Sequence, residues 1–191
     1  MLEHIVSKDG IRIDPKRVKA IQRLALPTNI SDLKSFFGQI NFLRSFFLEF
    51  SEKMRHILNM VSKKYPFRWK EEGKKDFEDI KMTISNAPML VSLNFEKDFI
   101  IYCYASEHTL SSILTQKDDQ ANQAPIAFMS ISLKKHELNY TQIEKHAFSM
   151  VKALKQFMYY ILHSHSVVYV PETIVKSILT QQEVGMNKRV V

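Results

Sequence analysis

The sequence predicts a mixed fold of helices and strands (α+β or α/β), with a helical first half and a sheet in the second half. Three observations support this. Apolar residues recur every three or four positions through residues 29–63 and again through residues 70–87, as they do on helices packed on one side, with a short extended piece expected at residues 65–69. Three short runs rich in β-branched and aromatic residues follow within residues 98–131. A long helical pattern then precedes one more apolar run, so the expected order is three strands, a helix, a strand and a helix.

The first expected elements are a hairpin and a short helix. The runs LEHIV and IRI flank the pair Asp9-Gly10, which favours a tight turn between two antiparallel strands. Asp14 is a suitable N-cap for the helix that follows. Pro15 fits the first turn of that helix because its missing N–H needs no partner there.

Residues 29–63 are expected to form two helices that pack against each other. Asn29 or Ser31 caps the first helix, which carries Gly38 near its middle, and the second begins at about Ser51. The run FFGQINFLRSFFLEF has the period of a helical core, so we prefer a core to an exposed surface for a protein partner.

The remaining elements are predicted from the spacing of apolar residues and from residues that end helices. An amphipathic helix is predicted over residues 70–87, because the residue before Pro88 avoids the helical region. The longest helix is predicted over residues 141–162, followed by the strand SVVYV and a last helix after Pro171. The three strands before the long helix are expected at residues 98–104, 110–116 and 125–131.

Charge and composition limit the partners. The chain of 191 residues has a net charge of +7 and a pI of about 9.4, which makes an anionic partner plausible. Its one cysteine, Cys103, cannot form an internal disulfide, which fits a reducing compartment. The sequence has neither the pattern of a signal peptide nor a long apolar run, so we expect an intracellular protein, in the cytoplasm or nucleus, without a membrane partner.

Three strings in order resemble the pol polyprotein of gypsy-type LTR retrotransposons. HIVSKDGIRIDPKRVKAIQRLALPTNISDLKSFFGQINFLRSFF is similar to the end of the reverse transcriptase palm running into the thumb. YPFRWKEEGKKDFEDIKMTISNAPMLVSLNFEKDFIIYCYAS resembles the connection that enters the RNase H domain, and NYTQIEKHAFSMVKALKQFMYYIL resembles its long helix. The resemblance implies a helical thumb-like segment followed by a truncated RNase H-like mixed sheet.

The resemblance also implies a division of the chain into three segments. The polymerase carboxylates would lie upstream of residue 1, so this chain is not expected to polymerise DNA by itself. The segments are residues 1–28 (end of the palm and a linker helix), 29–90 (thumb and connection) and 91–191 (truncated RNase H-like domain).

RNase H chemistry uses carboxylates around two divalent metal ions about 4 Å apart. By the resemblance, three of those carboxylate positions correspond here to Tyr104, His146 and Pro171. Glu144 is two residues before His146 and faces elsewhere on the helix, which leaves Glu172 as one candidate replacement. We therefore predict no catalytic residues, no metal site and no cofactor, with Mg²⁺ expected only if the RNase H site is active.

The thumb segment supplies the candidate nucleic-acid contacts. In reverse transcriptases a thumb helix follows the minor groove of the primer–template duplex, and basic residues nearby bind phosphates without reading sequence. Gly38 costs a helix about 1 kcal/mol against alanine, so it indicates either a close approach by a ligand or tight helix packing. The candidate contacts are Lys34, Gly38, Gln39, Asn41, Arg44, Lys53 and Arg55.

The first hypothesis is a catalytically dead segment that binds an RNA–DNA hybrid or other duplex weakly and without specificity, alongside the remainder of the reverse transcriptase. Whether the chain is an enzyme is left open, although the family activities are RNA-directed DNA polymerase and ribonuclease H. One alternative is a non-enzymatic protein-interaction module, domesticated or relic. The other is an active RNase H with substitute ligands such as Glu172 and His146.

Overall fold

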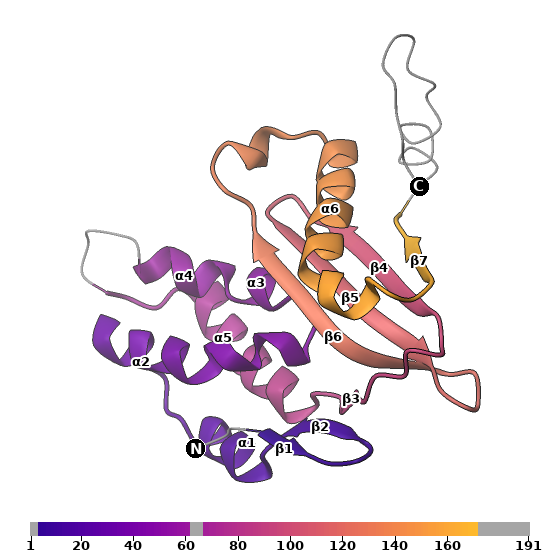
Figure 1. The fold of residues 1–191 in the computed structure, drawn as a ribbon. Helices are drawn as coiled ribbons and strands as arrows, with labels where there is room; N and C mark the ends of the chain where they lie inside the picture. The colour runs from indigo at the N-terminus through magenta and orange to yellow at the C-terminus, as the bar shows by residue number, and fades with distance from the viewer. Residues whose placement is uncertain (1–3, 62–66, 172–191) are drawn as a thin grey trace.

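The computed structural model describes residues 4–61 and 67–171. A helical part with a small sheet lies beside a four-stranded sheet that carries one long helix (Figure 1). The predicted mixed fold is therefore confirmed. The helix expected after Pro171 lies outside the described residues, as does Glu172.

The N-terminal hairpin is confirmed, but its turn differs from the prediction. Strands β1 (His4–Val6) and β2 (Gly10–Ile13) pair antiparallel, and β2 also pairs with the short β3 (Leu90–Val91), which the sequence did not reveal. Gly10 begins β2 instead of completing the turn. Its φ of +146° and a virtual Cβ only 2.0 Å from the Leu90 carbonyl oxygen explain why glycine is needed there.

The first two helices begin at side-chain caps. Helix α1 (Pro15–Gln22) follows Asp14, whose carboxylate accepts a hydrogen bond from the Lys16 N–H at 2.8 Å. Helix α2 (Ile30–Ile40) follows Asn29, which accepts from the Asp32 N–H at 2.9 Å, so Asn29 and not Ser31 is the cap.

The helices after α2 are shorter than the sequence pattern indicated. The chain tightens into the 3-10 helix η1 (Asn41–Phe46), and the helix expected from Ser51 is divided at Met54 into α3 (Phe50–Lys53) and α4 (Arg55–Val61). Helix α5 (Glu71–Ser85) has almost its predicted length, and its C-cap is Asn86, two residues before Pro88.

One core holds the helical part together. It includes residues of the predicted palm-end segment as well as of the thumb segment, so the two share a single packed interior. The phenylalanine-rich run belongs to it, as predicted, since Phe36, Phe46, Phe47 and Phe50 are all buried. The fully buried members include Ile21, Leu33, Ile40, Leu43, Ile57, Phe77 and Ile80. The division of the chain at residues 28 and 90 stays a prediction.

The second sheet has the order β6-β5-β4-β7. All four strands lie within two residues, at each end, of the ranges predicted from the sequence. The pairs β4–β5 and β5–β6 are antiparallel, whereas β7 lies parallel to β4 after the long helix. The strands are β4 (Phe99–Ala105), β5 (Thr109–Lys117), β6 (Gln123–Ser132) and β7 (Ser166–Tyr169).

Helix α6 (Gln142–Ile161), preceded by η2 (Glu137–Asn139), covers one face of this sheet (Figure 1). Thr141 and Glu144 form a reciprocal capping box at its start. Alternate β4 residues such as Ile101 and Cys103 face this helix, and Cys103 is 2 % exposed, as expected for a small buried apolar side chain. No helix among the described residues is long and apolar enough to cross a bilayer.

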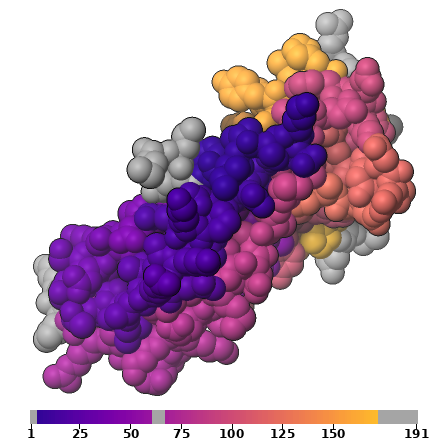
Figure 2. Space-filling view, turned by 90° about the horizontal axis from the view of Figure 1, so that it is seen from below, coloured from indigo at the N-terminus to yellow at the C-terminus, as the bar shows by residue number. Residues whose placement is uncertain are grey.

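The helical part packs against the opposite face of the sheet, near β6. Phe128 of β6 contacts the helical core, and η1 and α3 lie against the same strand. Figure 2 shows the indigo N-terminal residues running along this side of the molecule, from the purple helical residues toward the pink and orange residues of the sheet. The contacts of η1 and α3 with β6 join the two parts.

Candidate nucleic-acid interface

A groove of about 490 Å³ lies at the junction between the helical part and the sheet. One wall comes from α2, η1, α3 and α4, and the other comes from the last residues of β6. Its polar lining consists of hydroxyls, an amide and a guanidinium, all of which can donate to phosphate oxygens. The lining residues are Phe37, Gly38, Asn41, Arg44, Phe50, Ser51, Met54, Leu58, Ser130, Ile131 and Ser132.

Gly38 lies at the surface of this groove and is exposed. A Cβ atom built on it would meet no heavy atom within 4 Å among the described residues, so close packing of the described helices does not explain this glycine. A helix surface without a side chain lets a ligand approach the backbone closely. Of the two explanations that the sequence offers for Gly38, the close approach of a ligand therefore remains.

Asn41 and Arg44 follow Gly38 along the same wall, and both are exposed. One terminal nitrogen of Arg44 donates to the Ser130 carbonyl oxygen at 3.2 Å, and this bond links the two walls of the groove. A guanidinium has five N–H donors, so this bond leaves donors for a phosphate. Lys34 is exposed one helical turn before Gly38, on the same side of α2.

The other three predicted contacts lie elsewhere. Gln39 faces a separate pocket lined by residues such as Thr28 and Asp32, because successive helix residues point about 100° apart. Lys53 and Arg55 do not line the groove, and Arg55 Nε contacts a carboxylate oxygen of Glu52 at 3.0 Å. The structure thus gathers three of the seven predicted residues, with Lys34 beside them.

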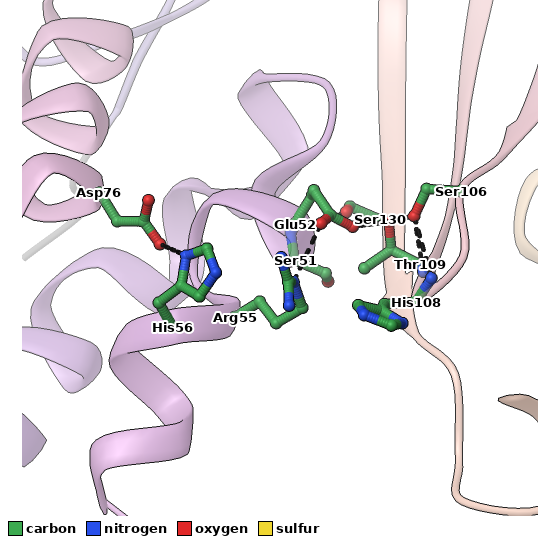
Figure 3. Close-up of polar contacts among 9 residues, drawn as sticks. All are labelled: Ser51, Glu52, Arg55, His56, Asp76, Ser106, His108, Thr109 and Ser130. Atoms are coloured by element: carbon green, nitrogen blue, oxygen red, sulfur yellow. Dashed lines mark hydrogen bonds and ion pairs between the residues drawn. The ribbon is translucent and has the colours of Figure 1, made fainter. Parts of the chain in front are cut away.

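A set of hydrogen bonds beside the groove fastens the two parts together. Figure 3 shows the Glu52 carboxylate pointing from α3 toward the turn between β4 and β5. One carboxylate oxygen accepts from the hydroxyls of Ser106 at 2.9 Å and Thr109 at 2.8 Å. The neighbouring Ser51 N–H donates to the Ser130 hydroxyl at 2.8 Å. These contacts join residues 54 to 79 positions apart in the sequence, and no sequence pattern indicates them.

Partial burial alone would raise the pKa of the Glu52 carboxyl group. The hydrogen bonds from Thr109 and Ser106, together with the charge of Arg55, outweigh that effect, so the pKa lies below its ordinary value of 4.5. A carboxylate with a lowered pKa stabilises the folded state above pH 4.5, and its contribution is lost as the pH falls through the folded-state pKa.

We expect Glu52→Gln to lower the free energy of unfolding by about 1–2 kcal/mol at neutral pH, because the charged acceptor shared by two hydroxyls is lost. The difference from the wild type should be smaller at an acidic pH below the folded-state pKa, where the wild-type carboxylate is protonated as well. Urea unfolding at the two pH values measures this. A difference in free energy of unfolding that stays constant with pH would contradict the lowered pKa of Glu52.

Two of the three positions that the resemblance relates to carboxylates lie close together. The Tyr104 ring lies 6.3 Å from the His146 ring, centroid to centroid. The parallel register between β4 and β7 ends at the pair Tyr102 and Tyr169, so Pro171 follows two residues beyond the paired part of β7. Tyr104 is 48 % exposed, whereas His146 is buried and contacts the Gln142 side chain at 3.2 Å.

These side chains do not fit a pair of magnesium ions. Mg²⁺ requires oxygen ligands, mainly carboxylates, whereas the three positions offer a phenol, an imidazole and a proline ring. Glu144 is occupied at the helix cap, where it accepts from the Thr141 N–H and hydroxyl. Within residues 4–61 and 67–171, no group of three or more His, Cys, Asp or Glu side chains could hold a metal ion.

Comparisons with solved structures give the fold. The chain is similar to the foamy viral protease-reverse transcriptase dRH in complex with double-stranded DNA, with a TM-score of 0.79 and 24 % identity over 95 % of this chain and 32 % of that one. It is also similar to the foamy viral protease-reverse transcriptase in complex with an RNA/DNA hybrid, with a TM-score of 0.76 and 23 % identity over 95 % of this chain and 25 % of that one.

Comparisons of sequence give the relatives. The chain is 32 % identical over 171 residues to a retrovirus-related Pol polyprotein from transposon opus of Drosophila melanogaster, covering 84 % of this chain and 17 % of the polyprotein. It is 35 % identical over 162 residues to the one from transposon 297 of the same species, covering 84 % and 15 %. The chain thus spans less than a fifth of these relatives, and the narrower gypsy-type assignment stays a prediction.

The RNase H-like domain found in reverse transcriptase matches residues 69–168, which is more than half of the chain. The match begins just before α5 and ends within β7, so it takes in the whole of the four-stranded sheet up to that strand. The shared fold, the relatives and this match agree, and the chain belongs to the family of RNase H-like domains found in reverse transcriptases.

Proposed function

We propose that this chain is a segment of a retrotransposon reverse transcriptase that holds a nucleic-acid duplex, such as an RNA–DNA hybrid, without cutting it. The groove carries the proposal, because it places a bare helix surface at Gly38 beside the donors of Asn41 and Arg44. Such a surface contacts sugars and phosphates and does not read bases, so binding would be weak and non-specific. The foamy viral relatives solved with double-stranded DNA and with an RNA/DNA hybrid support this use of the fold.

The absence of cleavage is part of the same proposal. Its support is the chemistry of Tyr104, His146 and Pro171, which supply no carboxylate at the end of the sheet where the resemblance places the metal ligands. An active RNase H with substitute ligands has less support, because His146 is buried and bonded to Gln142.

The test is a salt series of binding to a labelled RNA–DNA hybrid, followed by fluorescence anisotropy. We expect Arg44→Ala to weaken binding and to lower the slope of log affinity against log salt by about 1, the effect of one lost phosphate contact. Arg23→Ala is the matched control, because Arg23 is an exposed arginine at the end of α1, outside the groove. Equal effects of the two substitutions would show that binding depends on the overall charge of the protein and not on the groove.

Gly38→Leu tests the same groove without any change of charge. It should stabilise α2 by up to about 1 kcal/mol, because leucine is the better helix former and the site has space for a side chain. It should nevertheless weaken hybrid binding, because the new side chain occupies the surface that the duplex approaches. Unchanged affinity in a stabilised Gly38→Leu protein would exclude the groove as the binding surface.

A second candidate function is a non-enzymatic protein-interaction module. The observation in its favour is a line of exposed apolar side chains along α6, at the spacing of one helix face. These residues are Val151, Met158, Tyr159 and Leu162. This function predicts a folded protein with no affinity for the hybrid at physiological salt, in the same anisotropy experiment.

A further inference from the structure

Glu52 lies between the groove and the turn that joins β4 to β5. Its neighbour Ser51 lines the groove, and the Ser51 N–H donates to Ser130, which lines the opposite wall. The Glu52 side chain leaves the groove and reaches Ser106 and Thr109. The same short helix, α3, therefore forms one wall and makes the polar contacts with the sheet.

The turn between β4 and β5, which donates to Glu52, also has several hydrogen bonds within itself. The Ser106 hydroxyl accepts from the backbone N–H groups of His108 at 3.2 Å and Thr109 at 3.0 Å, and the Ser106 N–H donates to the Thr109 carbonyl oxygen at 2.9 Å. Thr109 is 3 % exposed, so its hydroxyl depends on a partner inside the protein. Its partners are the Glu52 carboxylate at 2.8 Å and the Ser106 hydroxyl at 3.0 Å, and Glu52 connects α3 to this hydrogen-bonded turn.

The connection is also fixed on the helical side. Arg55 contacts the second carboxylate oxygen of Glu52 at 3.0 Å, one helical turn along the chain, and thus limits the rotamers of Glu52. The next residue, His56, has its Nδ1 atom 2.8 Å from an Asp76 carboxylate oxygen, which ties α4 to α5 (Figure 3). A chain of polar contacts thus runs from α5 through α4 and α3 to the sheet.

We propose that Glu52 is a positioning residue for the duplex: its bonds to Ser106 and Thr109 hold the two walls of the groove in fixed relative positions, and with them the donors of Arg44 and Ser130 that would contact the duplex backbone. This inference rests on the proposed function, since the positions of these donors matter only if a duplex binds at this surface. It adds a residue that would act on binding without touching the nucleic acid. A loosened junction would leave Arg44 and Ser130 in variable relative positions, and binding that depends on both walls would weaken.

The direction in which hybrid affinity changes when Glu52 is replaced distinguishes a positioning role from a purely electrostatic one. Removal of a negative charge near a phosphate-binding groove should strengthen duplex binding if only electrostatics matters. A positioning role predicts instead that removal of the Glu52 side chain weakens duplex binding. Glu49 is the matched control, because it is an exposed glutamate three residues earlier, and its side chain makes no hydrogen bond among those that the structure shows for the described residues.

The experiment compares hybrid affinity for the wild type, Glu52→Ala, Glu52→Gln, Glu49→Ala and Thr109→Val. We expect Glu52→Ala to weaken binding about tenfold and Glu52→Gln to weaken it less, because an amide oxygen still accepts from the two hydroxyls. Thr109→Val should weaken binding with no change of charge, and Glu49→Ala should leave it equal or tighter. Tighter binding by Glu52→Ala and Glu49→Ala alike would overturn the proposal.

Hydrogen exchange without nucleic acid tests the connection by itself. In Glu52→Ala and Thr109→Val, the amides of His108 and Thr109 should exchange about tenfold faster than in the wild type. Unchanged exchange in both variants would overturn the positioning role. Failure of the wild type to bind the hybrid would instead overturn the proposed function, so the two failures can be told apart.

Discussion

Replacement of Phe77 by alanine is expected to lower the free energy of unfolding by about 3–5 kcal/mol. Phe77 is fully buried on α5, with its ring centroid 4.8 Å from Phe36 and 5.9 Å from Trp69. The ammonium group of Lys81 also lies 5.1 Å from the ring centroid. The truncation removes these contacts together and leaves a cavity where α2 and α5 meet. A domain stable by about 5–15 kcal/mol would lose a large share of its stability.

The measurement is urea unfolding followed by the fluorescence of Trp69, the one tryptophan of the chain, whose ring packs against Phe77. Met82→Ala on the same helix is the control. Met82 is 64 % exposed, so its replacement should change the free energy of unfolding by less than about 0.5 kcal/mol. Similar losses for the two substitutions would show that α5 is not held by this core.

The sequence predicted best those elements whose signals are local. The capping box at Thr141 and Glu144 and the cap at Asn29 involve residues three apart, so both helix starts could be found without the fold. The strands of the second sheet were also found, because their apolar and β-branched residues contrast with the polar turns between them. In each case the information lies within a few neighbouring residues.

The elements that the sequence missed depend on distant partners. The change from α2 to η1 after Ile40 keeps an apolar period that resembles continued helix, so packing and not pattern sets the break. The two-residue β3 exists because β2 lies against it, with Gly10 admitting the Leu90 carbonyl oxygen. Neither feature has a signal in the residues that form it.

The candidate site likewise combines residues that the sequence reveals with residues that only the fold brings together. Gly38, Asn41 and Arg44 could be selected by resemblance and by the oddness of a mid-helix glycine, and the structure gathers them along one groove. Gln39 was selected with them, but a single step along a helix turns its side chain to another side. The opposite wall at Ser130 and the bonds of Glu52 come from residues far away in the sequence, so only the fold could reveal them.

The combination of Tyr104→Asp, His146→Glu and Pro171→Asp is expected to create a metal-dependent protein. The Tyr104 and His146 rings are 6.3 Å apart, so carboxylates at these two positions would lie close together, and position 171 follows two residues after the last pair between β4 and β7. Without metal, their mutual repulsion and the burial of position 146 should lower the melting temperature relative to the wild type. Carboxylate oxygens are the ligands that Mg²⁺ and Mn²⁺ prefer, so either ion should reverse the loss.

Thermal unfolding with and without Mg²⁺ or Mn²⁺ measures this effect. A metal concentration ten times the dissociation constant stabilises the folded state by about 1.4 kcal/mol, which raises the melting temperature by a few degrees. The neutral triple variant Tyr104→Asn, His146→Gln and Pro171→Asn is the matched control and should not respond to metal. The wild type should respond to neither ion and should leave a labelled hybrid intact. Metal-dependent cleavage by the wild type would refute the proposal of a duplex-holding segment, because other residues would then supply the ligands.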